Sequence, residues 1–373
     1  MNAKERITVA MKNEIPDRVP VTLGLSESVP VRFFTDDYIE FFWKSKMPIW
    51  KARIETEHDR FGADGYLHLC EEASPEDPVV EKKNIKEKRD EIFYTNVIHT
   101  PKGDLEADFY LGRNTTTSAI THFVKDLNTD IPKVFELLKH PDTKDISAIN
   151  PAYQEIGTRG HAGFWIATPI DWWSELRGTQ EMIYDLMDYG ELLSPLFEVY
   201  TEYAESLVDY ILRNTPLDSV GIGGSNTSMS VISPDLYKKY TLDFGKTICK
   251  KAHEFDIPVQ YHMCGKSRAA LPITAEMGVD GFDALESPPT GTVDLAEVKK
   301  TFGHKHSLRG NVNSITVMKE GKPEDVEKDI LRCMNSAKEG GGFILGVGDQ
   351  TPYETSEENM FAFVESGKKL GKY

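Results

Sequence analysis

The sequence lacks an excess of positive charge and any long apolar run. Its 373 residues carry 43 lysines and arginines against 60 aspartates and glutamates, which gives a formal net charge of −17 at pH 7. Binding to nucleic acid or to an anionic membrane depends on a basic surface, so neither is expected. The longest charge-free stretch, 219–234, is rich in serine, glycine and asparagine and is unsuited to crossing a bilayer.

Signals for secretion and for disulfide bonds are also missing. Residues 1–18 are charged throughout and contain no apolar core of the length that a signal peptide needs. The four cysteines, at positions 70, 249, 264 and 333, are widely spaced, so we expect reduced thiols or metal ligands rather than disulfides. Cys249 and Cys333 lie in phase with apolar helix positions and are expected in the core. These features predict a cytoplasmic protein whose partners are small molecules or other proteins.

Short runs of β-branched or aromatic residues alternate with amphipathic helix patterns along the whole chain. The runs cover residues 19–24, 66–70, 163–168, 219–224, 258–262, 281–285, 307–311 and 343–347. Strands that alternate with helices pair in parallel, and eight such strands close a (β/α)₈ barrel. The sequence therefore predicts the α/β class and a TIM barrel.

A long segment separates the second run from the third. Within it, residues 91–99 and 104–111 flank the turn 100–103, a pattern that predicts a β-hairpin. We interpret residues 71–160 as an insertion built over one end of the barrel. Because no linker, repeat or low-complexity tract appears, residues 1–373 are expected to form one elaborated domain.

Polar side chains follow several of the predicted strands. They are Ser225 and Asn226 after 219–224, the stretch 261–265, Glu286 after 281–285, Asn311 at the end of 307–311, and residues 348–350 after 343–347. Active sites of TIM barrels lie at the carboxyl ends of the strands. These residues are therefore expected to converge on one pocket.

His262 and Cys264 are two residues apart, so on a strand their side chains point the same way. An imidazole and a thiolate so placed form half of a zinc site, and a catalytic zinc has three protein ligands and one open position. We expect Asp349 as the third ligand, with Glu286 as the alternative. A hydrogen-bonded core histidine and a small buried cysteine would produce the same spacing. A second H-x-C pair, His68 and Cys70, is followed by Glu71 and Glu72, and periodicity does not choose between the two pairs.

From about residue 18 to the C-terminal helix, the chain resembles the uroporphyrinogen decarboxylase superfamily, in particular its corrinoid-dependent methyltransferases. The resemblance rests on residues 16–20 (PDRVP), 177–178 (RG), 233–237 (SPDLY), 262–265 (HMCG), 310–311 (GN), 341–345 (GGFIL) and 358–359 (EN). In the methyltransferase branch the H-x-C-G motif supplies two zinc ligands. The resemblance thus implies that role for His262 and Cys264 rather than for His68 and Cys70.

Two departures from the family pattern narrow the implied function. The decarboxylases carry an arginine-rich segment after the first strand, whereas residues 24–29 (GLSESV) contain no arginine, so decarboxylation of a tetrapyrrole is not expected. The thiol-methylating branch has a second cysteine after the last strand, where this chain has Asp349. A site with one thiolate leaves zinc more electrophilic, which favours a leaving oxygen.

The resemblance therefore implies an O-demethylase that transfers a methyl group from a methoxylated aromatic donor to the Co(I) of a corrinoid (cobalamin) protein. Expected substrate contacts are Tyr66, Trp165, Trp172, Tyr261 and Met263, which would wall an apolar pocket, and Ser225, Asn226 and Asn311 at the strand ends. Two alternatives remain open. One is a methylcorrinoid:thiol methyltransferase, for example one acting on coenzyme M. The other is a noncatalytic subunit that docks a corrinoid protein or binds a small molecule.

Overall fold

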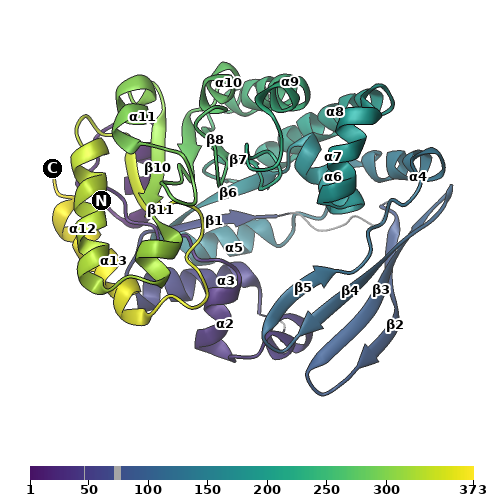
Figure 1. Cartoon of the computed structure of the whole chain (residues 1–373), viewed down its shortest axis with the longest axis horizontal. Coiled ribbons are helices and arrows are strands. Elements are labelled where there is room, and N and C mark those ends of the chain that lie inside the picture. Colours follow the sequence, from purple (N-terminus) through teal and green to yellow (C-terminus); the bar gives the residue numbers. More distant parts are fainter. Residues whose placement is uncertain (46, 71–76) are drawn as a thin grey trace.

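Seven parallel strands form the central sheet of the protein (Figure 1), whose computed structural model describes residues 1–45, 47–70 and 77–373. In spatial order they are β1 (Gly65–Leu69), β6 (Gly160–Ile166), β7 (Val220–Gly223), β8 (Val259–His262), β9 (Gly281–Asp283), β10 (Ser307–Val312) and β11 (Phe343–Val347). The spatial order follows the chain order. These strands coincide with seven of the eight predicted runs and confirm the α/β class.

The first predicted run, 19–24, is not a strand. Within it, Val21 forms an isolated parallel bridge with Leu345, and Leu25, the residue after the run, forms another with Thr351. The Thr22 amide donates to the Leu345 carbonyl at 2.9 Å, and the Asp64 amide donates to the Val21 carbonyl at 2.7 Å. Proline at position 20 lacks an amide hydrogen, and Gly24 has a φ of +59°, so an extended ladder cannot continue here. The segment nevertheless connects β11 with the residue that precedes β1.

Helices lie between the strands and cover the sheet. The α-helices are α1 (Ala3–Met11), α2 (Ser28–Phe34), α3 (Ile49–Ile54), α4 (Leu127–Val134), α5 (Ile149–Ile156), α6 (Pro169–Arg177), α7 (Thr179–Asp188), α8 (Gly190–Asn214), α9 (Pro234–His253), α10 (Leu271–Glu276), α11 (Leu295–Phe302), α12 (Pro323–Ala337) and α13 (Glu357–Leu370). Shorter 3₁₀ or π turns are η1 (Ile39–Lys44), η2 (Glu55–Arg60), η3 (Phe135–Leu138), η4 (Pro141–Thr143), η5 (Gly157–Arg159) and η6 (Ser314–Lys319). Helix α9 shows how sequence sets a boundary: the Ser233 hydroxyl accepts from the Leu236 amide, and Pro234 occupies the first turn.

A second, antiparallel sheet stands beside the central one (Figure 1) and contains β2 (Val79–Glu87), β3 (Glu91–Thr100), β4 (Gly103–Gly112) and β5 (Thr115–Ala119). β3 pairs with β4 from Glu91–Gly112 to Thr100–Gly103. Buried side chains of this second sheet, including Ile92, Tyr94 and Leu111, pack with Tyr38 and Phe41 of the η1 region in a separate small core. The predicted 71–160 span also holds α4 and α5, and β6 begins at its last residue.

The main core lies between the central sheet and its helices. Cys249 and Cys333 are both buried there, which confirms their expected place in the core. Within the described ranges, we find no helix that combines the length and apolar character required of a membrane span.

A buried carboxylate anchors the N-terminal segment to the sheet. Asp64 accepts hydrogen bonds from Arg6 Nη1 and Arg18 Nη1, each at 2.7 Å, and from the Val21 amide at 2.8 Å. Replacing Asp64 by alanine would leave Arg18 without a carboxylate partner, the Val21 amide without its acceptor, and Arg6 with Asp17 alone. We expect a loss of about 3–5 kcal/mol in the free energy of unfolding, measured by urea denaturation.

Asp59 supplies the matched control, because its ion pair with Arg159 at 2.6 Å lies on the surface. Asp59→Ala should change the free energy of unfolding by less than about 1 kcal/mol. Equal small losses in both variants would show that Asp64 does not anchor the segment.

Candidate metal centre at the strand ends

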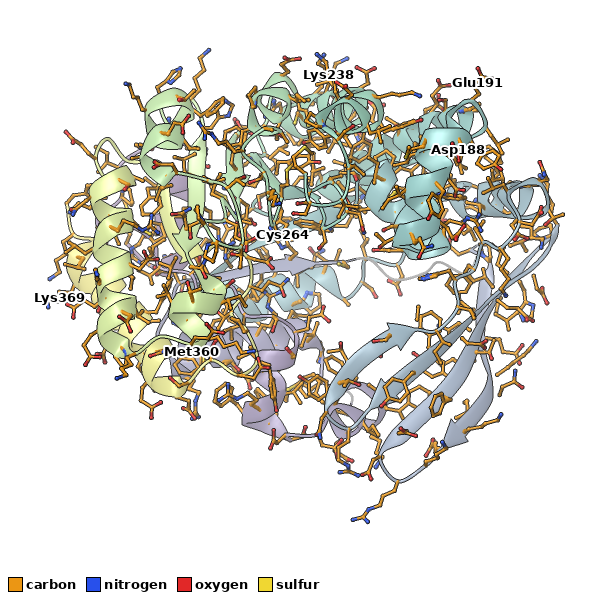
Figure 2. The ribbon with its side chains drawn as sticks, viewed as in Figure 1. Asp188, Glu191, Lys238, Cys264, Met360 and Lys369 are labelled. Atoms are coloured by element: carbon orange, nitrogen blue, oxygen red, sulfur yellow. The ribbon has the colours of Figure 1, made fainter. Side chains whose placement is uncertain are left out.

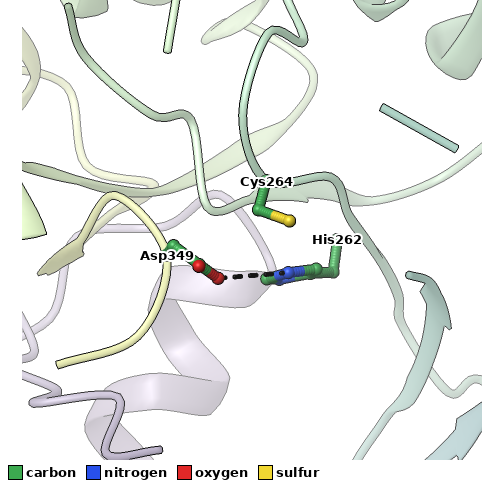
Figure 3. Close-up of side chains that lie close together, drawn as sticks. All are labelled: His262, Cys264 and Asp349. Carbon is green, nitrogen blue, oxygen red and sulfur yellow. Dashed lines mark ion pairs between the residues drawn. The ribbon is translucent and has the colours of Figure 1, made fainter. Parts of the chain in front are cut away.

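Three side chains from two strand ends converge in the structure (Figure 3). His262 is the last residue of β8, Cys264 follows it by two residues, and Asp349 follows β11. One ligand atom from each lies within 4.8 Å of the other two, and His262 Nε2 is 3.8 Å from Asp349 Oδ1. In the view of Figure 2, Cys264 lies near the centre and Lys369 at the left edge.

The alternation of β8 explains which of its side chains reach this site. Gln260 and His262 point into the barrel, where the Gln260 side chain meets the Tyr66 hydroxyl at 3.1 Å. Tyr261 points the opposite way and packs its ring edge-on against Tyr237 of α9. After the strand, the chain turns at Gly265, whose φ is +67°. This turn keeps Cys264 beside His262.

A buried charge network holds the His262 ring. His262 Nδ1 lies 2.8 Å from Asp283 Oδ2, at the end of β9, and the other Asp283 oxygen pairs with Arg309 of β10. Burial by itself would lower the pKa of His262, but contacts with Asp283 and Cys264 raise it to about 10. Burial would likewise raise the pKa of the Asp283 carboxyl, yet Arg309 and His262 hold it well below its usual range.

The arrangement fits a zinc ion. Asp283 occupies Nδ1 of His262, so Nε2 is the ring nitrogen that faces Asp349. Ligand atoms bound at about 2.0–2.2 Å to one tetrahedral ion are about 3.3–3.6 Å apart, close to the 3.8 Å between Nε2 and Oδ1. One nitrogen, one sulfur and one oxygen ligand would leave a fourth position open. A carboxylate on the second ring nitrogen is also the usual support for a metal-binding histidine.

Glu286, the alternative third ligand, does not join this group among the described residues. Its side chain is buried, and Oε2 accepts a hydrogen bond from the Gly265 amide. Glu286 therefore supports the turn that carries Cys264. Its carboxylate acts on the backbone of the loop instead of on the ligand cluster.

The second H-x-C pair is differently placed. His68 lies on β1 with a buried Nε2 that has no hydrogen-bond partner, and burial lowers its pKa to about 3. Cys70 is exposed just beyond the end of β1. In the described part of the chain, these two residues belong to no cluster of three potential ligands. Glu71 and Glu72, which completed that hypothesis, lie outside the described residues.

The aromatic residues expected to wall a pocket are divided between the site and the core. Trp165 on β6 is close to the candidate ligands, with ring centroids 5.8 Å from His262 and 5.1 Å from His68. Met263 lies between His262 and Cys264 in the chain, and its side chain is buried in the main core. Tyr66 is buried deeper in the barrel, with Arg309 4.8 Å above its ring.

Two other residues that were expected to line the pocket, Tyr261 and Trp172, lie elsewhere. Tyr261 faces the helix layer, as the strand alternation requires. Trp172 on α6 stacks on Tyr200 of α8, with ring centroids 4.3 Å apart. Both aromatic rings belong to helix packing, because their backbone positions direct them away from the barrel interior.

The expected polar substrate contacts are mostly occupied within the protein. Asn226 bonds through its side chain to Ser174 and Thr179, which fixes the loop after β7 against α6 and α7. The fully buried Asn311 donates to the Leu285 carbonyl and accepts from Arg332 Nη1 at 2.9 Å. Ser225 is exposed on the loop after β7. The two asparagines thus hold loops together.

Asp283 and Arg309 were not singled out from the sequence, although a signal was present. Each is a charged residue inside a predicted apolar strand. Charged side chains are seldom fully buried without a partner. Two opposite charges in consecutive predicted strands therefore indicated a pair inside the barrel.

Comparisons with known proteins agree with this architecture. The family model for uroporphyrinogen decarboxylase (URO-D) matches residues 152–370. A methylated-thiol–coenzyme M methyltransferase of Methanosarcina mazei is 28% identical over 39% of this chain and 36% of its own length. A methylcobamide:CoM methyltransferase of the same organism is 24% identical over 53% of this chain and 52% of its own. A uroporphyrinogen decarboxylase of Crocosphaera subtropica is 25% identical over 37% of each chain.

The matched regions thus span between about a third and a half of these curated relatives. A solved structure described as a methyltransferase from Methanosarcina mazei covers 99% of both chains at 18% identity, with a TM-score of 0.67, and shows the same fold. The family model covers more than half of the 373 residues. The chain belongs to the uroporphyrinogen decarboxylase family.

Proposed function

We propose that the chain is a zinc-dependent methyltransferase that moves a methyl group from a methoxylated aromatic compound to the corrinoid of a partner protein. Two relatives that it matches in part are methyltransferases, one named for methylated thiols and one for methylcobamide. The observation that carries the proposal is the cluster of His262, Cys264 and Asp349 at the carboxyl ends of the strands.

His262, Cys264 and Asp349 would hold the metal. When bound, zinc would supply a Lewis acid beside the heteroatom that carries the methyl group. A second thiolate would donate more charge and suit a bound thiol. The single thiolate of Cys264, with the carboxylate of Asp349, instead favours a substrate whose oxygen must accept negative charge as it leaves.

The other residues orient this group and limit water around it. Asp283 fixes the His262 ring through Nδ1, and Arg309 fixes Asp283 in turn. Trp165 supplies apolar surface next to the ligands. In the transfer, the carbon–oxygen bond breaks, the oxygen keeps the electron pair as a phenolate, and the corrinoid donates the pair that binds the methyl group.

A second candidate is methyl transfer from a methylcorrinoid to a thiol. The names of the two Methanosarcina relatives favour it, since both include coenzyme M. The carboxylate of Asp349 in the ligand cluster argues for the oxygen substrate. Both candidates use the same three side chains and differ in the direction of transfer.

One assay separates these candidates. The zinc-loaded protein is mixed with Co(I) corrinoid and, in turn, with methoxyarenes, methanol and methylamines, and methylcobalt is followed by its absorbance. A parallel mixture contains methylcorrinoid and a thiol. We expect methyl transfer from methoxyarenes; transfer only in the thiol mixture would replace the proposal with the second candidate.

The metal ligands can be tested by cysteine substitution. We expect one zinc per chain in the wild type, a large loss in Cys264→Ala and full occupancy in Cys70→Ala, because only Cys264 lies in the ligand cluster. Elemental analysis of the purified proteins measures this. The opposite pattern would move the site to the end of β1.

The carboxylates make a second comparison. Asp349→Asn should weaken zinc binding in competition with a chelator, whereas Glu286→Gln should leave it near the wild-type value, because Glu286 contacts the Gly265 amide. The reverse ranking would make Glu286 the ligand.

Asp283→Asn tests the support of the histidine. We expect zinc affinity to fall about 10–100-fold, since a neutral amide holds the ring less firmly. Asp104→Asn is the matched control, because Asp104 makes a similar 2.9 Å contact with Nδ1 of His99 on the surface. Equal zinc affinity in both variants would contradict the positioning role of Asp283.

Ligand charge should also set substrate preference. Asp349→Cys should retain zinc but lower kcat/KM for a methoxyarene, because a second thiolate makes the metal a poorer Lewis acid. An unchanged or higher kcat/KM in this variant would show that ligand charge does not direct the reaction to oxygen.

A further inference from the structure

A polar cavity of about 470 Å³ lies where the loop after β11 meets the second sheet. One wall is the segment Leu25–Ser28, and the opposite wall is Thr116 and Thr117 of β5 in the second sheet. Gln350, the residue after Asp349, Phe42 of η1 and Arg53 of α3 complete its lining. The cavity thus lies between the central sheet's strand ends and the second sheet.

The connection between this cavity and the metal centre is short along the chain. The Thr351 amide donates to the Gly24 carbonyl at 2.9 Å, and Leu25 forms a parallel bridge with Thr351. Asp349 and Gln350 are therefore pinned directly against the segment that forms the cavity wall. A molecule in the cavity would contact Gln350, one residue from Asp349.

Arg53 is the unusual member of the lining. Its Nε is buried and has no hydrogen-bond partner. Within the described ranges, its one ion pair is with Glu57, where Nη2 and Oε1 are 3.7 Å apart, beyond hydrogen-bond distance. The Glu57 carboxylate is instead engaged by the amides of Leu25, at 3.1 Å, and Tyr66, at 3.4 Å.

A guanidinium with unfilled donors in a cavity is suited to an oxyanion that presents two adjacent oxygens. A carboxylate or sulfonate can accept two parallel hydrogen bonds from it, and such charge-assisted bonds are among the stronger polar contacts in proteins. Glu57 partly offsets the charge of Arg53 but, at 3.7 Å, does not use its donors. Hydroxyl side chains on the other walls can donate to the same ligand, and the carboxylate of Glu27, which also lines the cavity, is exposed.

We infer that the substrate of this site carries an oxyanion, a carboxylate or a sulfonate, that binds Arg53 while its methyl-bearing end reaches the metal centre. The part of this inference that places the methyl-bearing end at the metal centre rests on the proposed function. The anion site itself stands on the cavity and on Arg53. In the proposed reaction, the anion site selects methoxylated aromatic acids over neutral methoxyarenes.

Isothermal titration calorimetry on the zinc-loaded full chain tests the anion site without any turnover. The probes are 3-methoxybenzoate, its neutral counterpart 3-methoxybenzamide, and 3-methoxybenzenesulfonate. We expect the benzoate to bind at least tenfold more tightly than the benzamide, and Arg53→Gln to weaken benzoate binding about tenfold to hundredfold while leaving benzamide binding unchanged. Comparing the affinities for the sulfonate and the benzoate shows which oxyanion the site prefers.

Two further variants guard against a purely structural effect. Arg213→Gln removes the same charge from an exposed ion pair with Asp209 and should not change binding. Thr117→Glu, at an exposed position of β5, should weaken benzoate binding without affecting the fold, because it adds a negative charge to the opposite wall. If Arg53→Gln fails to fold, this variant carries the test.

The outcomes separate the inference from the proposed function. Benzoate binding that depends on Arg53, without methyl transfer from any donor, would keep the anion site and remove the function. Equal binding of benzoate and benzamide, no binding of either anion, or full benzoate binding in a folded Arg53→Gln or Thr117→Glu variant would overturn the inference. Methyl transfer from neutral methoxyarenes as fast as from methoxybenzoate would overturn its link to the reaction.

Discussion

The ion pair between Arg309 and Asp283 inside the barrel is the contact on which the candidate site depends. Both side chains are buried, and either charge alone would be costly in this place. Arg309 also donates from Nε to the Thr22 hydroxyl at 3.0 Å, so it connects β10, β9 and the segment 19–24. The second oxygen of Asp283 then holds His262. Arg309 thereby fixes both the segment 19–24 and the orientation of the His262 imidazole.

The second sheet gives the site a surface that the central sheet cannot supply. Leu111 of β4 belongs to its separate small core, and the pairing of β5 with β4 brings Thr116 and Thr117 to the cavity. The walls of the 470 Å³ cavity therefore come from β5 and from segments around the central sheet, including the loop after β11. In this arrangement the central sheet would hold the reacting end of a substrate, while the second sheet and Arg53 would distinguish its other end.

Much of this could be predicted from the sequence, because buried parallel strands are continuous apolar runs and their carboxyl ends meet at one edge. Those two rules located seven strands and brought His262, Cys264 and Asp349 together. Residues 19–24 resemble a strand in composition, yet Pro20 and Gly24 limit them to isolated bridges. Strand alternation also excludes Tyr261 from the site, because its side chain must point to the face opposite His262. Arg53 could not be found in this way, since a six-residue helix far along the chain from the ligands brings it to the cavity.

X-ray absorption at the zinc edge of the purified protein tests the central claim most directly, because it counts the ligand atoms around the metal. The account predicts one sulfur at about 2.3 Å, with nitrogen and oxygen ligands at about 2.0–2.2 Å. The sulfur signal should disappear in Cys264→Ala. A shell with two or more sulfur ligands, or one that is the same in the wild type and in Cys264→Ala, would contradict a site formed by His262, Cys264 and Asp349.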